Sequence, residues 1–394
     1  MKRFTDREIK FIEDNEGKDV DGLRLKYSAK GDSDFDLDLC LDQIEARNRF
    51  ERKLPSFFKI RGVVFPPRMN LEQSSSEQTA LYKQGLIKKG ETLVDLTSGF
   101  GADSFFLAKK ASRVVCVERD GTLSRLCAFN FRLAGLTNCE FVNGSCEQYL
   151  QEMDRVDVIY IDPSRRDEHK NRLLSLSSFS PDVLKLMPQL TDKASRVIVK
   201  LSPMTDLKLL RQEVEYLTDI HIVSLRNECK EVLAVISKVE DKPLMYHCVN
   251  ILEQKTDCTD FFFEKAVANL DSVKFSSEMK KFFFEPNSSF LKAGIFTPLC
   301  MKYNVEKLHP NTHLFTSDER IGDFEGRGFE LLEQRHAGIK ALRDIERANI
   351  TVRNFPWTVE TIRKRTKIKE GGDLYLFFTT LLGERKVCLL ARKI

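Results

Sequence analysis

The sequence has little tryptophan, with one residue in 394, and it lacks any long apolar run. The longest uncharged, mostly apolar stretch is ten residues, Leu374 to Gly383, about half of the ~20 residues that a bilayer crossing needs. We therefore expect no membrane span. The first residues alternate in charge where a secretory signal would carry an apolar segment, so we expect a cytoplasmic protein.

The ten cysteines stand singly, without a CxxC pair and without a nearby histidine at metal-ligand spacing. This pattern argues against a zinc ribbon and against a disulfide framework, so we expect reduced thiols and no metal site. Hydrophobic residues make up 42% and charged residues 31%, as in a globular chain, and the length of 394 residues predicts two or three domains. The net charge of +4 is too small to indicate a nucleic-acid partner by itself.

Basic residues are nevertheless concentrated in two segments. Seven of them accompany one acidic residue between Arg47 and Arg68, and a second cluster lies between Arg363 and Lys369. Within the second cluster, Arg363, Lys364 and Lys367 have helical spacings that share a face. Such a face releases counterions when it binds the phosphates of RNA. A solvated helix face has the same pattern, so both interpretations stay open.

Hydrophobic patterns divide the chain into four predicted domains. Residues 1–84 have apolar positions at helical spacing, and Ser74 with Glu77 has the spacing of a capping box for the next helix. Residues 85–240 alternate seven Val/Ile-rich runs with amphipathic stretches, which predicts a mostly parallel Rossmann-like sheet with an antiparallel last strand. The pattern loosens over 241–320, and 321–394 is typical of an α+β module with a helix over 337–348.

A glycine-containing turn follows the first predicted strand and opens a helix. It contains Asp95, Thr97, Gly99 and Gly101. In open α/β sheets, ligands bind beyond the carboxyl ends of strands, where glycines let the backbone approach them. Glu118 ends the second predicted strand, where a carboxylate can accept hydrogen bonds from both hydroxyls of a ribose. The spacing therefore predicts a nucleotide site.

Two cofactors are compatible with this turn. A dinucleotide fingerprint would have a third glycine-like residue where Ser104 stands. A pyrophosphate also prefers a helix N-terminus without carboxylates, whereas Asp95 and Asp103 flank this one. Their charge favours a cationic ligand. We therefore predict S-adenosyl-L-methionine, and the alternatives are NAD and a pocket without a ligand.

A second candidate site follows the fourth predicted strand. Methyl transfer requires mainly that the lone pair of the acceptor is aimed at the methyl carbon. Asp162 and the carbonyl of Pro163 could accept the N–H groups of an exocyclic base amine and orient it. Arg165 and Arg166 could stack on a base or bind phosphate, or they could close a surface loop through salt bridges.

Three further residues are weaker candidates. Methylation of a pyrimidine carbon would require a thiolate, and Cys229 could supply one, although a structural thiol is the simpler interpretation. Lys200 and Glu228 are possible substrate contacts, with surface charge as the alternative.

The glycine turn resembles motif I of the class I S-adenosylmethionine-dependent methyltransferases, and the resemblance implies that Glu118 binds the ribose. In that family the end of the third strand contacts the adenine, which implies Asn143 or Ser145 here; a plain Asn-Gly turn is the alternative. The Asp162-Pro163 motif is similar to the Asp/Asn-Pro-Pro-aromatic signature of methyltransferases that act on exocyclic amines. Ser164 and Arg165 replace its second proline and its aromatic residue.

Other segments resemble bacterial class I methyltransferases with a THUMP-like C-terminal domain, over most of the chain. The matching segments are 72–77, 162–166, 227–231, 284–287, 350–356 and 367–375. The resemblance implies a helical N-terminal domain (1–84), a methyltransferase domain (85–240), a ferredoxin-like domain (241–320) and a THUMP-like domain (321–394). The THUMP-like domain implies an RNA partner by analogy. Together with the Asp162-Pro163 motif, this predicts methylation of a base nitrogen in rRNA or tRNA. The alternatives are a protein or small-molecule substrate, or a catalytically silent RNA-binding scaffold.

Overall fold

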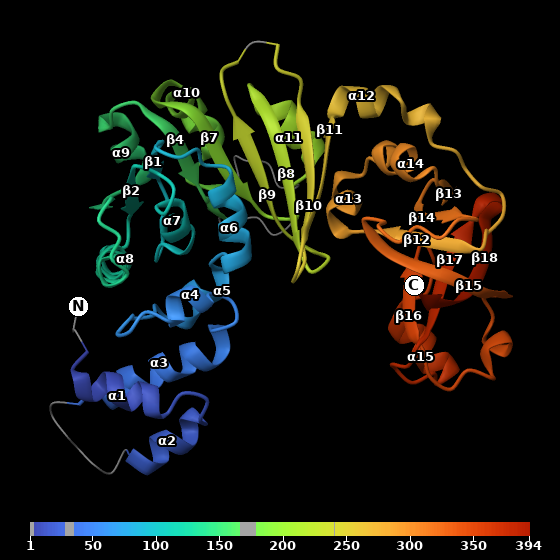
Figure 1. The fold of residues 1–394 in the computed structure, drawn as a ribbon, viewed down its shortest axis with the longest axis horizontal. Coiled ribbons are helices and arrows are strands. Elements are labelled where there is room, and N and C mark those ends of the chain that lie inside the picture. The colour runs from blue at the N-terminus through green and yellow to red at the C-terminus, as the bar shows by residue number, and fades with distance from the viewer. Residues whose placement is uncertain (1–3, 28–34, 166–178, 240) are drawn as a thin grey trace. The chain divides into compact units, whose positions relative to one another are not determined.

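The computed structural model describes residues 4–27, 35–165, 179–239 and 241–394. The chain forms two compact units, Met1–Thr218 with Val232–Lys242, and Asp219–Glu231 with Pro243–Ile394. The first unit contains the N-terminal helices and the glycine turn, and the second contains the C-terminal α+β modules (Figure 1). Among the described residues, none of the helices has the length and apolarity that a bilayer span requires.

Over residues 4–27 and 35–85, which the structure describes, the first unit has six helices, and this confirms the expected helical region. They are α1 (Asp6–Asp14), α2 (Val20–Tyr27), α3 (Leu37–Phe50), α4 (Pro55–Phe58), α5 (Arg68–Gln73) and α6 (Glu77–Gly85). The predicted capping box of Ser74 and Glu77 is wrong. Ser76 caps α6, because its hydroxyl accepts a hydrogen bond from the Thr79 backbone at 3.3 Å. The carboxylate of Glu77 instead accepts two hydrogen bonds from Ser56.

All seven predicted strands form, and six of them contribute to the sheet of the first unit in the order β9-β7-β4-β1-β2-β3. Neighbouring strands are parallel except β9, which is antiparallel to β7 as expected. The strands are β1 (Thr92–Asp95), β2 (Arg113–Glu118), β3 (Cys139–Asn143), β4 (Val156–Ile161), β7 (Ala194–Leu201) and β9 (Glu228–Ile236). A separate pair consists of β5 (Ser164–Arg165) and β6 (Phe179–Ser180).

Helices cover this sheet and bury its strands. They are α7 (Ala102–Leu107), α8 (Gly121–Leu133), α9 (Cys146–Glu152), α10 (Val183–Lys193) and α11 (Leu207–Glu213). Helix α8 contacts β2 and β3, and α10 contacts β7 (Figure 1). Because β1, β2 and β4 are parallel, their carboxyl ends meet at one edge of the sheet. That edge brings together the predicted residues Asp95, Glu118 and Asp162.

The second unit contains two groups of strands. In the first group, β10 (Met245–Ile251) lies between β8 (Leu217–Leu225), to which it is parallel, and β11 (Thr256–Phe262), to which it is antiparallel. The sequence pattern did not predict β10 and β11. The helix α12 (Phe263–Ala268) follows them.

The second group is a C-terminal sheet in the order β13-β14-β12-β15-β18-β17-β16, which confirms the expected α+β modules. Its core includes the rings of Phe283, Phe329 and Phe377. The strands are β12 (Phe282–Pro286), β13 (Glu306–His309), β14 (Thr312–Ser317), β15 (Gly326–His336), β16 (Asn349–Arg353), β17 (Leu374–Leu381) and β18 (Arg385–Lys393). The helices are α13 (Ser288–Ala293), α14 (Thr297–Tyr303) and α15 (Val359–Thr366).

The prediction of a helix over 337–348 is wrong. Only Ile339–Leu342 form a short 3-10 turn. The guanidinium of Arg335 donates a hydrogen bond to the Ala341 carbonyl at 2.9 Å and pairs with Asp344 at 2.6 Å. The carbonyl that would continue a helix is therefore bound by a side chain of β15.

Candidate active site

The turn between β1 and α7 is built on two glycines with left-handed backbone angles, φ 57° at Gly99 and φ 90° at Gly101. A Cβ at Gly101 would lie 2.5 Å from the sulfur of Cys127 and 2.7 Å from the ring of Phe131, both on α8. A Cβ at Gly99 would meet no atom within 4 Å. Gly101 is therefore required for close packing of the turn on α8, whereas Gly99 borders open space.

The Glu118 carboxylate at the end of β2 is tied to this turn. One oxygen accepts a hydrogen bond from the Gly99 backbone at 2.9 Å, and the other accepts one from the Asp120 backbone at 2.9 Å. The side chain is half-buried. Each carboxylate oxygen can accept more than one hydrogen bond, so Glu118 can also accept from the hydroxyls of a ribose.

Asp95 lies beneath the turn and is 1% exposed. It accepts hydrogen bonds from the Thr97 backbone at 3.0 Å and from the Ser104 hydroxyl. Burial raises the pKa of Asp95 to about 7, although both hydrogen bonds act in the opposite direction. The residue therefore shapes the turn from inside the protein, and Ser104 is its partner where a dinucleotide fingerprint would have a glycine.

Asp103 is also buried, but its charge is balanced within the protein. It lies 3.1 Å from the ammonium of Lys83 and 3.7 Å from that of Lys200. The hydroxyls of Ser75 and Tyr160 donate hydrogen bonds to it, each at 2.8 Å. Burial would raise the pKa of Asp103, but the two ammonium groups outweigh it and lower the pKa. The sequence argument that counted Asp103 toward a cationic ligand is therefore wrong on this point.

The two candidates for adenine contact have defined positions near the end of β3. Asn143 donates hydrogen bonds to the carbonyls of Glu118 at 2.9 Å and Arg119 at 3.0 Å. Ser145 caps α9 by accepting a hydrogen bond from the Gln148 backbone at 3.1 Å. Asn143 thus holds the loop that carries Glu118, and a contact of either residue with adenine stays a prediction.

The loop after β4 carries Asp162 and the buried Pro163. The Asp162 backbone donates a hydrogen bond to the hydroxyl of Thr97 at 2.6 Å, and the Lys200 ammonium donates one to the Asp162 carboxylate at 2.6 Å. The Asp162 side chain is 37% exposed, so an acceptor can reach it. The backbone of Arg165 pairs with that of Phe179; Arg166 lies outside the described residues.

The remaining chemical candidates are constrained by their surroundings. Burial raises the pKa of the Cys229 thiol to about 11, despite the opposing charge of Lys292. The thiol is therefore protonated near neutral pH, which disfavours its use as a nucleophile. Within the part of the chain that the structure describes, no group of three or more His, Cys, Asp and Glu residues is arranged to hold a metal ion.

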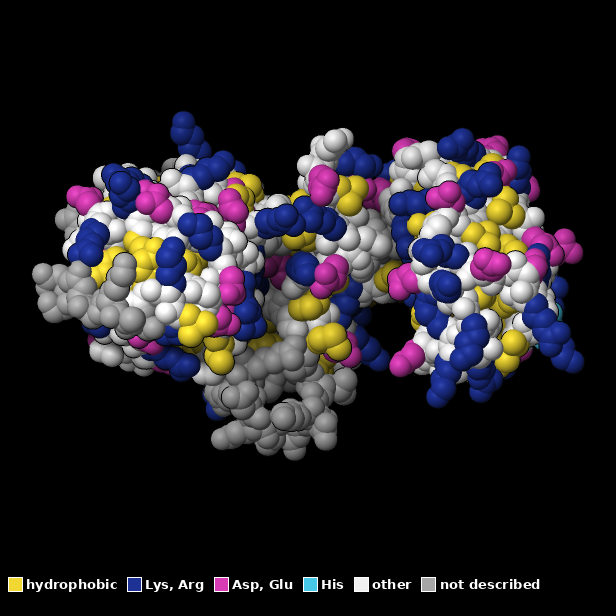
Figure 2. Space-filling model, turned by 90° about the horizontal axis from the view of Figure 1, so that it is seen from below, with side chains coloured by type: hydrophobic (Ala, Val, Ile, Leu, Met, Phe, Trp, Pro, Cys, Tyr) yellow, Lys and Arg dark blue, Asp and Glu magenta, His cyan; other side chains and the backbone are white. Residues whose placement is uncertain are grey.

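The predicted RNA-binding residues differ in their surroundings. Lys364 and Lys367 at the end of α15 are exposed. The guanidinium of Arg363 instead donates hydrogen bonds to the carbonyls of Ile368 at 3.0 Å and Ala348 at 3.4 Å. Figure 2 shows Lys and Arg side chains lying among Asp and Glu over one face of the molecule. Only part of the second basic cluster is therefore free to contact phosphates.

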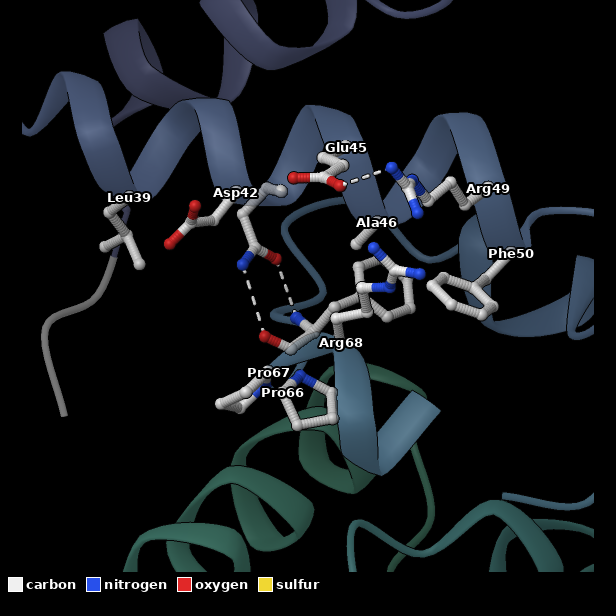
Figure 3. Close-up of a pocket in the computed structure, with 11 residues that line it drawn as sticks. Leu39, Asp42, Glu45, Ala46, Arg49, Phe50, Pro66, Pro67 and Arg68 are labelled. Atoms are coloured by element: carbon white, nitrogen blue, oxygen red, sulfur yellow. Dashed lines mark hydrogen bonds and ion pairs between the residues drawn. The ribbon is translucent and has the colours of Figure 1, made fainter. Parts of the chain in front are cut away.

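The first basic cluster borders a pocket of about 280 Å³ between α3 and the segment 65–68. The Gln43 amide, which lines the pocket, donates a hydrogen bond to the Phe65 carbonyl at 3.2 Å and accepts one from the Phe65 backbone N–H at 2.7 Å. Arg49 pairs with Glu45 at 3.0 Å (Figure 3), and Arg68 pairs with Glu72 at 2.7 Å outside the pocket. Most of the charge at this pocket is thus already balanced, and none of the predicted nucleotide-site residues lines it.

Comparison with known proteins supports the two C-terminal modules and the whole fold. A ferredoxin-like domain model matches residues 282–324, and a THUMP domain-like model matches residues 326–393. A crystal structure from Porphyromonas gingivalis W83, assigned as a methyltransferase, superimposes with a TM-score of 0.87 at 30% identity over 100% of both chains. The chain belongs to this family of methyltransferases with a THUMP-like C-terminal domain.

Curated relatives of this methyltransferase family member are named as RNA methyltransferases. An uncharacterized RNA methyltransferase of Enterococcus faecalis is 24% identical over 189 residues, 45% of this chain and 40% of the relative. Ribosomal RNA small subunit methyltransferase J of Shewanella denitrificans is 30% identical over 193 residues, 43% of this chain and 76% of the relative. The match spans between about a quarter and two fifths of the first relatives' length.

Proposed function

We propose that the protein is an S-adenosylmethionine-dependent methyltransferase that acts in the cytoplasm on a base nitrogen of structured rRNA or tRNA. The observation that carries the proposal is the hydrogen bond between Thr97 in the glycine turn and Asp162 after β4. It joins the predicted cofactor turn and the predicted transfer loop at one edge of the sheet. A cofactor bound at the first would therefore lie beside an acceptor held at the second.

The residues at the turn fit S-adenosylmethionine. The half-exposed carboxylate of Glu118 suits a ribose, and Gly99 leaves space beside it. Asp103 and Asp162 are both paired with lysines, so the carboxylate at this edge that could face a sulfonium or an ammonium is that of Glu118. Its charge disfavours a pyrophosphate at this edge. The cofactor supplies a methyl group that is activated by the adjacent sulfonium.

The contribution of the chain to the transfer is mainly positioning. The Asp162 carboxylate and the Pro163 carbonyl accept the N–H groups of the acceptor amine, which aims its lone pair. The carboxylate can also take the proton that the amine loses. Removing this group should therefore slow transfer without weakening cofactor binding, since Glu118 and the glycine turn are unchanged.

The support for RNA comes from the names of the relatives, the THUMP-like domain and the exposed lysines of α15. The test has two parts. First, total RNA from cells with and without the gene is digested and its modified nucleosides are compared. Second, purified protein is assayed for tritium transfer from S-adenosyl-[methyl-³H]methionine to RNA from the deletion strain. We expect one nucleoside to be lost in the deletion strain and restored in vitro. RNA binding without any transfer would instead support a scaffold.

A further inference from the structure

Lys200 bridges the transfer loop and a buried polar cluster of the first unit. Its ammonium lies 2.6 Å from the Asp162 carboxylate and 3.7 Å from that of Asp103. The Lys200 side chain is 12% exposed and Asp162 is 37% exposed. The pair therefore has a buried cationic end and an accessible carboxylate end.

The contact with Lys200 restricts how Asp162 can be used. Lys200 binds the Oδ2 oxygen of Asp162, and no described residue donates a hydrogen bond to the Oδ1 oxygen. A carboxylate without a partner rotates about its Cα–Cβ and Cβ–Cγ bonds. When one of its oxygens is held by an ion pair, the second oxygen keeps a fixed direction. Such prior orientation lowers the entropic cost of aligning an acceptor.

The position of Lys200 is fixed in turn by Asp103. That carboxylate is held by the Lys83 ammonium of α6 at 3.1 Å and by hydrogen bonds from Ser75 and Tyr160. Lys83 is 1% exposed, and its ammonium also donates a hydrogen bond to Ser75 at 3.1 Å. Two lysines and two aspartates thus alternate from α6 to the transfer loop. Breaking a buried ion pair leaves a charge without compensation and is costly, so these contacts disfavour other positions of Lys200.

We propose that Lys200 is a positioning residue for methyl transfer, which it serves by holding the Asp162 carboxylate with Oδ1 directed at the acceptor nitrogen. The inference rests on the proposed function. In this role Lys200 acts through Asp162 and need not contact the cofactor or the acceptor. Its loss should therefore lower kcat and leave the affinity for S-adenosylmethionine unchanged.

The test is a double-mutant cycle with Asp162→Asn, Lys200→Met and the combined variant. The assay is tritium transfer from S-adenosyl-[methyl-³H]methionine to total RNA of the deletion strain. We expect Lys200→Met to lower kcat by about 10- to 100-fold, as for a misaligned catalytic group, with KM for RNA nearly unchanged. The combined variant should be no slower than Asp162→Asn alone. Lys200→Arg, which keeps the positive charge, should recover part of the rate.

Two controls separate this role from a structural one. Lys185→Met changes a lysine of the same unit that is 82% exposed, and it should leave the rate unchanged. Calorimetry with S-adenosylmethionine should give the same Kd for wild type and Lys200→Met if the variant is folded. The proposal would be overturned if the kcat of the combined variant fell by the product of the two single fold-losses. A Lys200→Met variant as fast as wild type would also overturn it. Wild type that transfers no methyl group would instead refute the proposed function, and the positioning role with it.

Discussion

The hydroxyl of Thr97 accepts a hydrogen bond from the backbone N–H of Asp162 at 2.6 Å. Thr97 stands two residues after the end of β1 and Asp162 directly follows β4, and these two strands are parallel neighbours. The side chain therefore joins the two loops that we assign to cofactor and acceptor. Their relative position depends on one hydroxyl as well as on the sheet below.

Thr97→Val should uncouple these two loops. Valine has nearly the shape of threonine but leaves the Asp162 N–H without its acceptor, which should cost about 1 kcal/mol of stability or more, because the site is partly buried. We expect slower methyl transfer together with a lower free energy of unfolding in urea. Thr97→Ser keeps the hydroxyl and is the matched control. A Thr97→Val protein as stable and as fast as wild type, with a loss only in Thr97→Ser, would show that the methyl group of Thr97, rather than its hydrogen bond, is what matters.

The two glycines of the turn should respond differently to alanine. Gly101→Ala places a methyl group 2.5 Å from Cys127, on a backbone with φ 90°. Crowding then adds to backbone strain, and the free energy of unfolding should fall by more than about 2 kcal/mol. Gly99→Ala carries only the left-handed strain of about 1 kcal/mol. Urea unfolding of both variants measures the difference. A Gly101→Ala protein as stable as Gly99→Ala would mean that the turn at Gly101 is not packed on α8 as described.

Burial of Asp95 predicts a specific pH dependence of stability. Its pKa is raised to about 7 in the folded protein, so between its unfolded value near 4 and pH 7 the folded state holds a proton that the unfolded state releases. The contribution of Asp95 to the free energy of unfolding is therefore present at low pH and is lost as the pH rises through that window. Between pH 4 and 7 we expect the free energy of unfolding of wild type to fall by up to about 4 kcal/mol relative to that of Asp95→Asn, at about 1.36 kcal/mol per pKa unit.

Urea unfolding of wild type and Asp95→Asn at matched pH values gives this difference, since other groups titrate in both proteins. Parallel curves for the two proteins would show that Asp95 is ionised throughout. A difference that grows in the opposite direction would mean that the folded protein lowers its pKa.

The sequence predicted the fold class and the seven strands because hydrophobic period and strand length are local properties. The same reasoning placed Glu118 and Asp162 at strand ends, where parallel topology brings them to one edge. It failed where side-chain contacts that the hydrophobic pattern does not encode accompany a different structure. The guanidinium of Arg335 binds the Ala341 carbonyl within the helix predicted over 337–348, and Ser56 binds the Glu77 carboxylate that was expected to cap a helix.

The clearest omission is Lys83. In the sequence it is a lysine within an amphipathic helix, where exposure is the usual state. Its burial follows only from the tertiary approach of α6 to Asp103, which the pattern does not encode. The same contact removed Asp103 from the predicted charge of the nucleotide site. Charges counted along a sequence therefore need their partners before they indicate a ligand.

RNA binding by α15 should depend on Lys364 and not on Arg363. Lys364→Gln removes an exposed charge, which should weaken binding to RNA and lower the slope of log K against log salt by about 0.7–0.9 if one phosphate contact is lost. Arg363→Gln should mainly lower stability, because its guanidinium binds two backbone carbonyls. Filter binding to total RNA at several salt concentrations distinguishes them. An unchanged slope in Lys364→Gln would remove this residue from the RNA-binding surface.

The most direct test of the central claim, that the turn from Asp95 to Gly101 with Glu118 holds S-adenosylmethionine, is calorimetric titration of this compound into wild type and Glu118→Ala. We predict binding to wild type, with a loss of about 1.5–3 kcal/mol in the variant because charge-assisted hydrogen bonds to the ribose are removed. Equal affinity for both proteins, or binding of NAD in place of S-adenosylmethionine, would contradict the account.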